Sequence, residues 1–339
     1  MATTEKSSAK LSGLASEHWF TSPTARAFGA LIIVFALGLL FNADGAFYKW
    51  GTHRDMLRAV SVYGILSCGM TLVIISGGID LSVASILALT AVFFSLFTIH
   101  KGISTPIAIL ACLVIGSLCG MFSGAVIAKF RIQPFIATLA MMVFARGMAK
   151  WVSGGQKIST AVQQSDGSYK YVNVPQIFNL INSKVLGDNI TVVTLIFIAC
   201  LIISWILLVK LRYGRYIYAI GGNEEAARLS GVPVGWTKIL AYGMSGLFCA
   251  VAGMCQAAQE LQGDPEAGMS YELSAIAMVV IGGTSLQGGR GGIWLTLIGV
   301  LTIGYLEKIL SINAVGEDKR LMLTAAIIIA AVLLQKEKK

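Results

Sequence analysis

Long apolar segments recur along this chain from residue 27 to the C-terminus, and they restrict its fold more than any other feature. Each segment is close to the roughly 20 residues that cross a bilayer as an α-helix. Only 13% of the 339 residues are charged, which is too few to give a soluble protein of this length a polar surface. The segments are continuous rather than alternating, which argues against an outer-membrane β-barrel. We therefore predict an all-α integral membrane protein.

About ten membrane-spanning helices are predicted from these segments. They cover approximately residues 27–42, 57–75, 79–99, 104–128, 134–151, 190–210, 237–258, 272–286, 291–310 and 319–335. Lys and Arg are enriched in cytoplasmic loops, so the basic residues around 211–236 and at the C-terminus favour the cytoplasmic side. With this orientation residues 1–26 and 336–339 are cytoplasmic tails. Residues 27–335 form a single membrane domain, whose polar loop 152–189 lies outside and whose segment 211–236 lies inside.

Most of the net charge of +9 falls in loops and tails. There it orients the chain and meets anionic lipid, so membrane lipid rather than nucleic acid is the expected partner of these charges. The six cysteines lie inside apolar segments and are typical of packing residues, and the three histidines are scattered. Neither a phosphate-binding loop nor a hydrolase or metalloprotease motif is present in the sequence. We expect a protein that is not an enzyme and that binds no metal or cofactor directly.

Two glycine-rich stretches interrupt the apolar segments and indicate broken or re-entrant helices near 76–80 and 282–290. The first reads VIISGGIDLSVAS (73–85) and the second VVIGGTSLQGGRGG (279–292). In interrupted spans the freed backbone groups and helix ends can face a polar cavity at membrane depth. Chance is the favoured explanation for the similarity of the two stretches, and an internal repeat is the alternative. Their candidate substrate-pathway residues are Ser76, Gly77, Gly78, Asp80, Ser82, Gly282, Gly283 and Thr284.

Ionisable residues inside spans cost about 2.5–3.5 kcal/mol each, so each needs a reason. Asp80 follows the first glycine pair, where the helix start can be capped by Asp80 or Ser82, and where Asp80 can also contact a substrate. Arg146 lies deep in the fifth predicted span, and we expect it to pair with an acid or a carbonyl group. Phe135 and Glu272 are further pathway candidates; an interfacial aromatic and a solvated loop charge are the alternatives.

The polar segment GGNEEAARLSG (221–231) carries the start and stop signals of a helix. Asn223 is a preferred N-cap, Glu224 and Glu225 fall in the first turn, and Gly231 suits a left-handed stop. A helix of this length is about 10 Å long and cannot span a membrane. Presented to the cytoplasm by the basic stem 212–222, it is predicted to dock into a groove on a partner protein. The candidate docking residues are Arg215, Gly221, Gly222, Asn223, Glu224, Ala226, Ala227, Arg228, Ser230 and Gly231.

Five sequence blocks, in this order, resemble the inner-membrane permease subunits of bacterial ABC importers for monosaccharides, of the ribose permease type. The blocks are GMTLVIISGGIDLSVAS (69–85), RIQPFIATLAMMVFARGM (131–148), RYGRYIYAIGGNEEAARLSGV (212–232), YELSAIAMVVIGGTSLQGGRGG (271–292) and LIGVLTIGYL (297–306). The resemblance implies a dimer of permeases, commonly identical, with two ATPase subunits beneath it and a periplasmic or lipid-anchored sugar-binding protein above it. It also implies that 221–231 is the coupling helix and that ATP binds to the ATPase subunits.

Two departures from the family pattern leave the sugar open. Ala84 stands where the family usually has the glycine of GIDLSVGS, and Ser274 stands where it has the acidic residue of YELDAIA. The implied cargo is a ribose-like pentose, a hexose or a related polyol. The alternatives are an ABC permease for branched-chain amino acids and an ion-coupled secondary carrier that uses Asp80. A capped docking helix counts against the carrier, because a carrier needs no ATPase.

Overall fold

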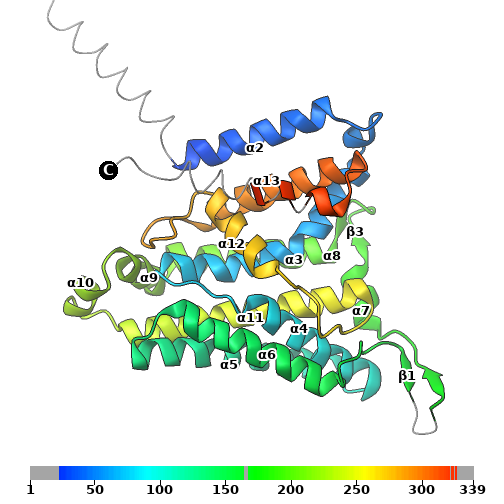
Figure 1. Ribbon diagram of the computed structural model, residues 1–339, viewed down its shortest axis with the longest axis horizontal. Coiled ribbons are helices and arrows are strands. Elements are labelled where there is room, and N and C mark those ends of the chain that lie inside the picture. The colour runs from blue at the N-terminus through cyan, green and yellow to red at the C-terminus, as the bar shows by residue number, and fades with distance from the viewer. Residues whose placement is uncertain (1–22, 164–166, 321, 324, 327–339) are drawn as a thin grey trace, which may run out of the picture.

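The computed structural model describes residues 23–163, 167–320, 322, 323, 325 and 326, and these form a helical bundle (Figure 1). The long helices are α2 (Pro23–Leu40), α3 (Trp50–Ile75), α4 (Val83–Ser95), α5 (Thr105–Phe130), α6 (Pro134–Ser153), α8 (Val192–Trp205), α11 (Val234–Glu260), α12 (Tyr271–Ile281) and α13 (Ile293–Ile312). Two wider π-helical turns, η2 (Leu96–His100) and η3 (Ile206–Lys210), extend α4 and α8. The shorter elements are η1 (Ala46–Tyr48), α7 (Gln176–Asn182), α9 (Arg212–Gly222), α10 (Glu224–Leu229), β1 (Ala161–Gln163), β2 (Tyr169–Tyr171), β3 (Lys184–Val185) and β4 (Ile190–Thr191).

The all-α membrane fold is confirmed, but the count of ten spans is not. Among the described residues, seven helices are long and apolar enough to cross a membrane, and two shorter apolar helices cover Thr24–Leu40 and Tyr271–Ile281. The second of these is short because the chain leaves the helix at Gly282 and turns at Gly283, whose φ is +104°. Most of the predicted span 319–335, residues 1–22 of the predicted N-terminal tail and the whole C-terminal tail lie outside the described residues. Residues 23–26, predicted to belong to the N-terminal tail, are part of α2.

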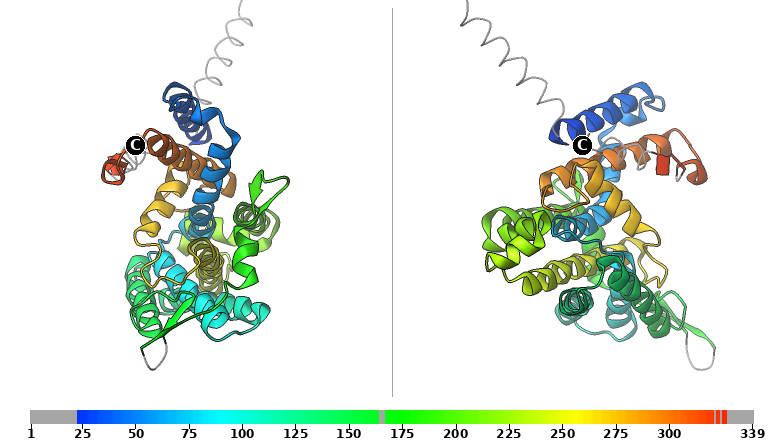
Figure 2. Two further views of the ribbon diagram at one scale, coloured as in Figure 1. Left: turned by 90° about the vertical axis from the view of Figure 1, so that its right-hand side faces the viewer. Right: turned by 60° about the vertical axis from the view of Figure 1, so that its left-hand side comes forward.

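Three predicted boundaries are corrected. The loop expected over 43–56 is shorter, since α3 begins at Trp50. The span expected from residue 79 begins at Val83, because the first glycine break continues through Ser82. The loop 152–189 contains local structure: β1 pairs with β2, α7 follows, and β3 pairs with β4. This loop and the α9–α10 unit lie at opposite ends of the bundle (Figure 1, Figure 2).

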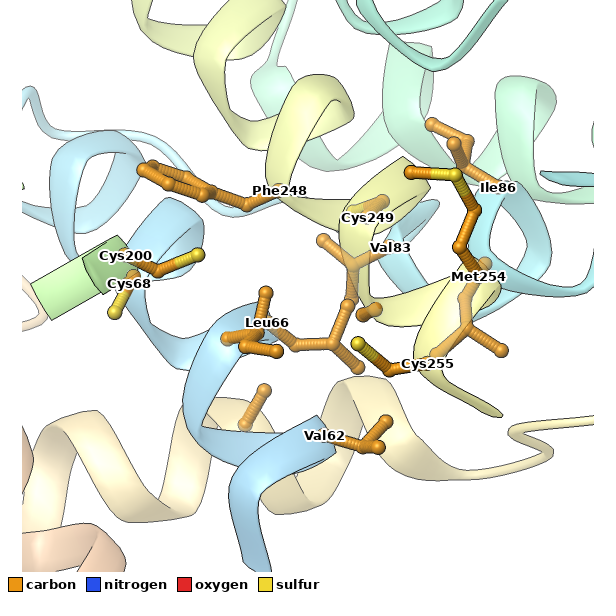
Figure 3. Packing of buried hydrophobic residues seen from close by; sticks show 14 of the residues in the cluster. Val62, Leu66, Cys68, Val83, Ile86, Cys200, Phe248, Cys249, Met254 and Cys255 are labelled. Atoms are coloured by element: carbon orange, nitrogen blue, oxygen red, sulfur yellow. The ribbon is translucent and has the colours of Figure 1, made fainter. Parts of the chain in front are cut away.

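Helix α11 packs at the centre of the bundle against α3, α4 and α5. Figure 3 shows part of this core, in which Cys68 of α3, Cys200 of α8 and Cys249 and Cys255 of α11 lie among aliphatic side chains. All six cysteines are free; five are buried and Cys119 is partly buried, in keeping with the predicted packing role. By contrast α5 and α6 expose large apolar side chains, as expected of helices that face lipid or another subunit. These are Ile107, Leu110, Val114, Leu118 and Phe122 on α5 and Phe135, Ile136, Leu139, Val143 and Phe144 on α6.

Glycines spaced four residues apart set the close contact between α5 and α11. A Cβ placed on Gly116, Gly120 or Gly124 would overlap the backbone of α11. Small residues at such positions let helix backbones approach closely, which is how helices associate without a hydrophobic driving force in lipid. This GxxxGxxxG pattern of α5 therefore serves the packing of α5 on α11.

Candidate functional site

Helices α9 and α10 form a tight pair joined by a single residue, Asn223. The Asn223 side-chain oxygen accepts a hydrogen bond of 2.9 Å from the Ala226 amide, which satisfies one free donor at the start of α10. At the other end Gly231 adopts a φ of +81°, and the Val232 amide donates to the Ala227 carbonyl at 3.0 Å. Both predicted caps of the short helix are confirmed.

The charged residues of α10 are paired within the chain. The Arg228 guanidinium contacts Glu224 at 2.8 Å and Glu225 at 2.7 Å, and Lys238 of α11 contacts Glu224 at 2.6 Å. The Lys238 pair fastens α10 to the first turns of α11. Arg215 of α9 is exposed and forms no ion pair within the described part of the chain. Arg215 and Arg228 are both candidate docking residues, and of these two only Arg215 has a charge that is not paired within the described chain.

One side of α10 faces the protein and the other faces out. Ala227 is buried with Ile220 of α9 and Val234 of α11, so its side chain points away from any partner. Ala226, Leu229 and Ser230 are exposed, and Leu229 is 82% exposed. Leu229 was not among the predicted docking residues, although a lone leucine on a capped polar helix is a signal of an apolar anchor.

The predicted basic stem 212–222 is itself a helix, α9. Gly214, Ile217 and Ile220 are buried at intervals of three residues, and this periodicity in the sequence was the available signal. The Tyr213 hydroxyl donates to the Thr237 carbonyl at 3.1 Å, and burial raises the pKa of Tyr213. Helix α9 is thus fixed to the first turn of α11.

The first glycine break joins α3 to α4 and contains a buried carboxylate. Asp80 is fully buried; it accepts hydrogen bonds from the Ser82 amide at 3.0 Å, from the Ser82 hydroxyl, and from the Ser245 hydroxyl of α11 at 2.8 Å. Asp80 thus satisfies an amide just ahead of α4, whereas the Ser82 side chain makes no capping bond to the helix. Of the two predicted capping residues, the structure therefore favours Asp80 over Ser82. Ser76 is also buried, and its hydroxyl bonds back to the Val73 carbonyl.

The second glycine break joins α12 to α13 and folds back on itself. The Ser285 amide donates to the Arg290 carbonyl at 3.0 Å, and Thr284 is buried. Two hydrogen bonds connect this break to other parts of the chain. The Gly289 amide donates to the Ile75 carbonyl at 2.9 Å, and the Tyr218 hydroxyl donates to the Gly291 carbonyl at 2.9 Å. The two breaks, far apart in sequence, meet beside the end of α9.

A cavity of about 540 Å³ opens beside α10. It lies between α10, the α5–α6 turn and the start of α11, and its polar lining includes Arg131, Gln133, Glu224 and Lys238. Gly77 of the first break also lines it. A much smaller pocket continues past Ser76, Gly77 and Gly78 to Tyr242, whose buried hydroxyl has no hydrogen-bond partner among the described residues. The cavity therefore connects the α10 end of the bundle with the first break.

The two other pathway candidates lie on α6 and α12. Phe135 is half-exposed near the start of α6. This end of α6 contacts the first glycine break, since the Thr138 hydroxyl donates to the Ile79 carbonyl at 3.2 Å and Pro134 lines the small pocket at that break. Glu272 is half-buried in the first turn of α12, at the opposite end of that helix from Gly282, and it interacts electrostatically with Arg146. Glu272 therefore lies away from the second break.

Arg146 holds the loop between α11 and α12. Its guanidinium donates to the Pro265 carbonyl at 2.7 Å and to the Ala267 carbonyl at 3.0 Å, which confirms the predicted pairing with carbonyl groups. Two surface ion pairs flank this contact, Lys150 with Glu266 at 2.8 Å and Lys157 with Asp264 at 2.9 Å. The Lys150 hydrogen bond lowers the pKa of the Glu266 carboxyl. The Lys150–Glu266 ion pair therefore stabilises the loop fully at pH values above the ordinary pKa of a glutamate carboxyl. This stabilisation is lost as the pH falls through the lowered pKa of Glu266.

Comparison with known proteins supplies the family. The sequence pattern of the family described as "Branched-chain amino acid transport system / permease component" matches residues 54–332. The chain is 37% identical to the ribose import permease protein RbsC of Escherichia coli (strain K12) over 310 residues, covering 91% of this chain and 92% of that protein. It is 33% identical to the fructose import permease protein FrcC of Rhizobium meliloti over 92% of this chain and 85% of that protein. It is 38% identical to the L-arabinose transport system permease protein AraH of E. coli (strain K12), over 91% of this chain and 90% of that protein. No solved structure was found to match the chain.

Proposed function

Because the chain belongs to the ribose-type permease subunits of ABC sugar importers, we propose that it moves a ribose-like pentose, a hexose or a related polyol into the cytoplasm, with ATP hydrolysed by a partner subunit. As a family member it is a multi-pass inner-membrane transport subunit. The relatives named above import ribose, fructose and L-arabinose according to their names, which supports a monosaccharide as the cargo class.

The structure of helix α10 supports the proposal that a partner subunit supplies the energy for transport. It is capped at both ends, packed on α9 and α11 through its inner side, and exposed on its outer side at Ala226, Leu229 and Ser230. A short helix held in this way suits docking into a groove on an ATPase subunit. The orientation with α10 in the cytoplasm follows from the basic residues around it.

The transport route is proposed to pass the two glycine breaks. The cavity beside α10 reaches Gly77 and Gly78, and its carboxylate, ammonium and amide groups can exchange hydrogen bonds with a polyol. The apolar faces of α5 and α6 leave room for a second permease copy or paralogue. A periplasmic or lipid-anchored sugar-binding protein would deliver the sugar at the end that carries the β1–β2 hairpin.

Two alternatives are weighed against this proposal. The family description names branched-chain amino acids, but the relatives quoted above are named for sugars. An ion-coupled carrier would expose its coupling carboxylate to the pathway in at least one state. Asp80 is instead fully buried and accepts three hydrogen bonds from protein groups.

Reconstitution tests the proposal directly. The purified permease is placed in proteoliposomes with its ATPase and sugar-binding protein, and uptake of labelled ribose, fructose, L-arabinose and leucine is measured. We expect ATP-dependent uptake of one of the sugars and none by the permease alone. Accumulation of sugar by the permease alone on a proton or sodium gradient would refute ATP coupling, and uptake of leucine only would refute the sugar assignment.

A further inference from the structure

Three segments that are remote in sequence touch through glycine backbones, and we call this the glycine contact. Its members are Gly77 of the first break, Gly221 at the end of α9, and Gly288 and Gly289 of the second break. The Gly289 amide donates to the Ile75 carbonyl at 2.9 Å, so the two breaks are bonded to each other directly. Gly221 lies against both of them.

Gly221 leaves no room for a side chain. A Cβ at this position would overlap the Ile75 carbonyl oxygen and the Gly289 amide nitrogen, one from each break. A Cβ at Gly288 would lie 2.9 Å from the Gly77 Cα and 2.9 Å from the Gly221 carbonyl oxygen. The neighbouring Gly222, also in α9, would meet no atom within 4 Å. Both glycines approach Gly289 through their backbones, but only at Gly221 would an added side chain enter the contact.

One side chain of α9 reinforces the contact. The Tyr218 hydroxyl, one turn before Gly222, donates to the Gly291 carbonyl of the second break at 2.9 Å. Helix α9 therefore reaches the second break by a side-chain hydrogen bond and by backbone packing, and it reaches the first break by backbone packing.

The other end of this connection is the docking helix. Only Asn223 separates α9 from α10, and its side chain caps α10. Ile220 of α9 and Ala227 of α10 are buried in one apolar cluster. A displacement of α10 must therefore move the end of α9, because packed interfaces shift between discrete arrangements rather than deform continuously.

We infer that Gly221 is a positioning residue for transport, through which α9 carries the movement of α10 to both glycine breaks at once. In this arrangement the partner docks on α10, α9 transmits the displacement of α10, and the two glycine breaks are the segments of the pathway that move. The inference rests on the proposed function, since it assumes that an ATPase docks on α10.

The test compares Gly221→Ala with Gly222→Ala in the full complex of permease and ATPase. Neither glycine has a positive φ, so alanine suits the backbone at both positions and only the contact differs. We expect Gly221→Ala to bind the ATPase within twofold of wild type while ATP-dependent uptake falls at least tenfold. Gly222→Ala, whose added Cβ meets no other atom, should lose uptake only in proportion to any loss of ATPase binding.

A second readout does not depend on the sugar. A cysteine placed at Leu286, which is exposed in the second break, reports movement of that break through its rate of maleimide labelling. ATP should change this rate in the wild-type background and with Gly222→Ala, but not with Gly221→Ala. Tyr218→Phe removes the hydrogen bond to Gly291 and adds no atoms to the contact. It therefore tests the same inference if Gly221→Ala fails to fold. We expect Tyr218→Phe to reduce the ATP-dependent change in labelling rate severalfold.

The outcomes separate the two proposals. If the wild-type permease does not bind the ATPase, the proposed function fails. The other outcome assumes that the wild-type complex couples ATP to uptake. If Gly221→Ala and Tyr218→Phe then both behave like Gly222→Ala in uptake and in labelling, only the role of Gly221 and α9 is overturned. If Gly221→Ala does not assemble, normal coupling by Tyr218→Phe overturns it.

Discussion

Ser245 of α11 donates a hydrogen bond of 2.8 Å to the Asp80 carboxylate, although the two residues are 165 positions apart. This bond ties the first glycine break to the helix that begins directly after α10. The break is thus connected to α10 by two routes, the glycine contact through α9 and the Asp80 bond through α11. The two routes can be interrupted separately.

Replacing Ser245 by alanine should weaken the fold and the link to α11. Asp80 would keep its two bonds from Ser82 but would lose one donor in a fully buried setting. Hydrogen bonds to charged groups contribute about 1.5–3 kcal/mol, so we expect a lower thermal midpoint in detergent. Ser95→Ala is the control, because the buried Ser95 hydroxyl has no hydrogen-bond partner among the described residues. Equal losses in both variants would show that the Asp80 bond is not responsible.

Replacing Asn223 by alanine should loosen α10 without unfolding the protein. Loss of an N-cap costs about 1 kcal/mol, and here the cost falls on a helix of only six residues. We expect faster amide exchange over 224–229 and a several-fold weaker affinity for the ATPase. Asn223→Ser is the matched control, since serine caps helices about as well as asparagine. Normal affinity in the alanine variant would mean that the ATPase orders α10 without any loss of binding free energy, and it would contradict this prediction.

Arg215 and Arg228 should differ in how they affect docking. Arg215 is exposed and unpaired within the described chain, whereas Arg228 is held by Glu224 and Glu225. Arg215→Ala should slow association with the ATPase and reduce its salt dependence, because exposed interface charges act mainly on the on-rate. Arg228→Ala should instead disturb α10, by about 0.3–0.5 kcal/mol for each exposed helix pair lost. Association rates at two salt concentrations distinguish them, and an identical salt response in both variants would contradict this assignment.

Local signals in the sequence were sufficient to predict the helical membrane fold, the two glycine breaks and the caps of α10. Each depends on residues close together in the chain: apolar stretches, a glycine pair, or an asparagine followed by glutamates. Arg146 was also predicted to find a carbonyl group, since a charge within a span needs a partner. The partners themselves, Pro265 and Ala267, were not predictable, because they come from a loop more than a hundred residues away.

The meeting of the two breaks at Gly221 was beyond sequence reasoning for the same reason. In the sequence Gly221 is one of two adjacent glycines, and the neighbouring residues give no basis for expecting a different role for Gly221 than for Gly222. Ala227 was a candidate docking residue but is buried against α9 and α11, and a six-residue helix with two adjacent alanines gives no periodicity that separates it from Ala226. Among the described residues, α12 is shorter than the predicted span 272–286, because hydropathy cannot locate where a broken helix stops, here at Gly282.

Arg146→Met should release the loop 261–270 while leaving the bundle intact. The loop would lose two hydrogen bonds from a charged donor, at about 1.5–3 kcal/mol each. We expect faster amide exchange in this loop and weaker stimulation by the sugar-binding protein. Lys150→Met removes only the exposed pair with Glu266, which contributes at most about 1 kcal/mol, and should have little effect. A loop that stays protected in Arg146→Met would show that the ion pairs suffice to hold it.

Alanine at Gly120 and at Gly147 should have opposite effects, although both glycines lie inside long helices. A Cβ at Gly120 would overlap the Tyr242 carbonyl oxygen and force α5 away from α11, and overpacking of this kind costs about 1–3 kcal/mol. A Cβ at Gly147 of α6 meets no atom within 4 Å, so the helix propensity of alanine should stabilise α6 by up to about 1 kcal/mol. Thermal midpoints in detergent should therefore fall for Gly120→Ala and stay level or rise for Gly147→Ala. If Gly147→Ala is the more damaging change in the assembled transporter but not in the isolated chain, then the exposed side of α6 is covered by another subunit and not by lipid.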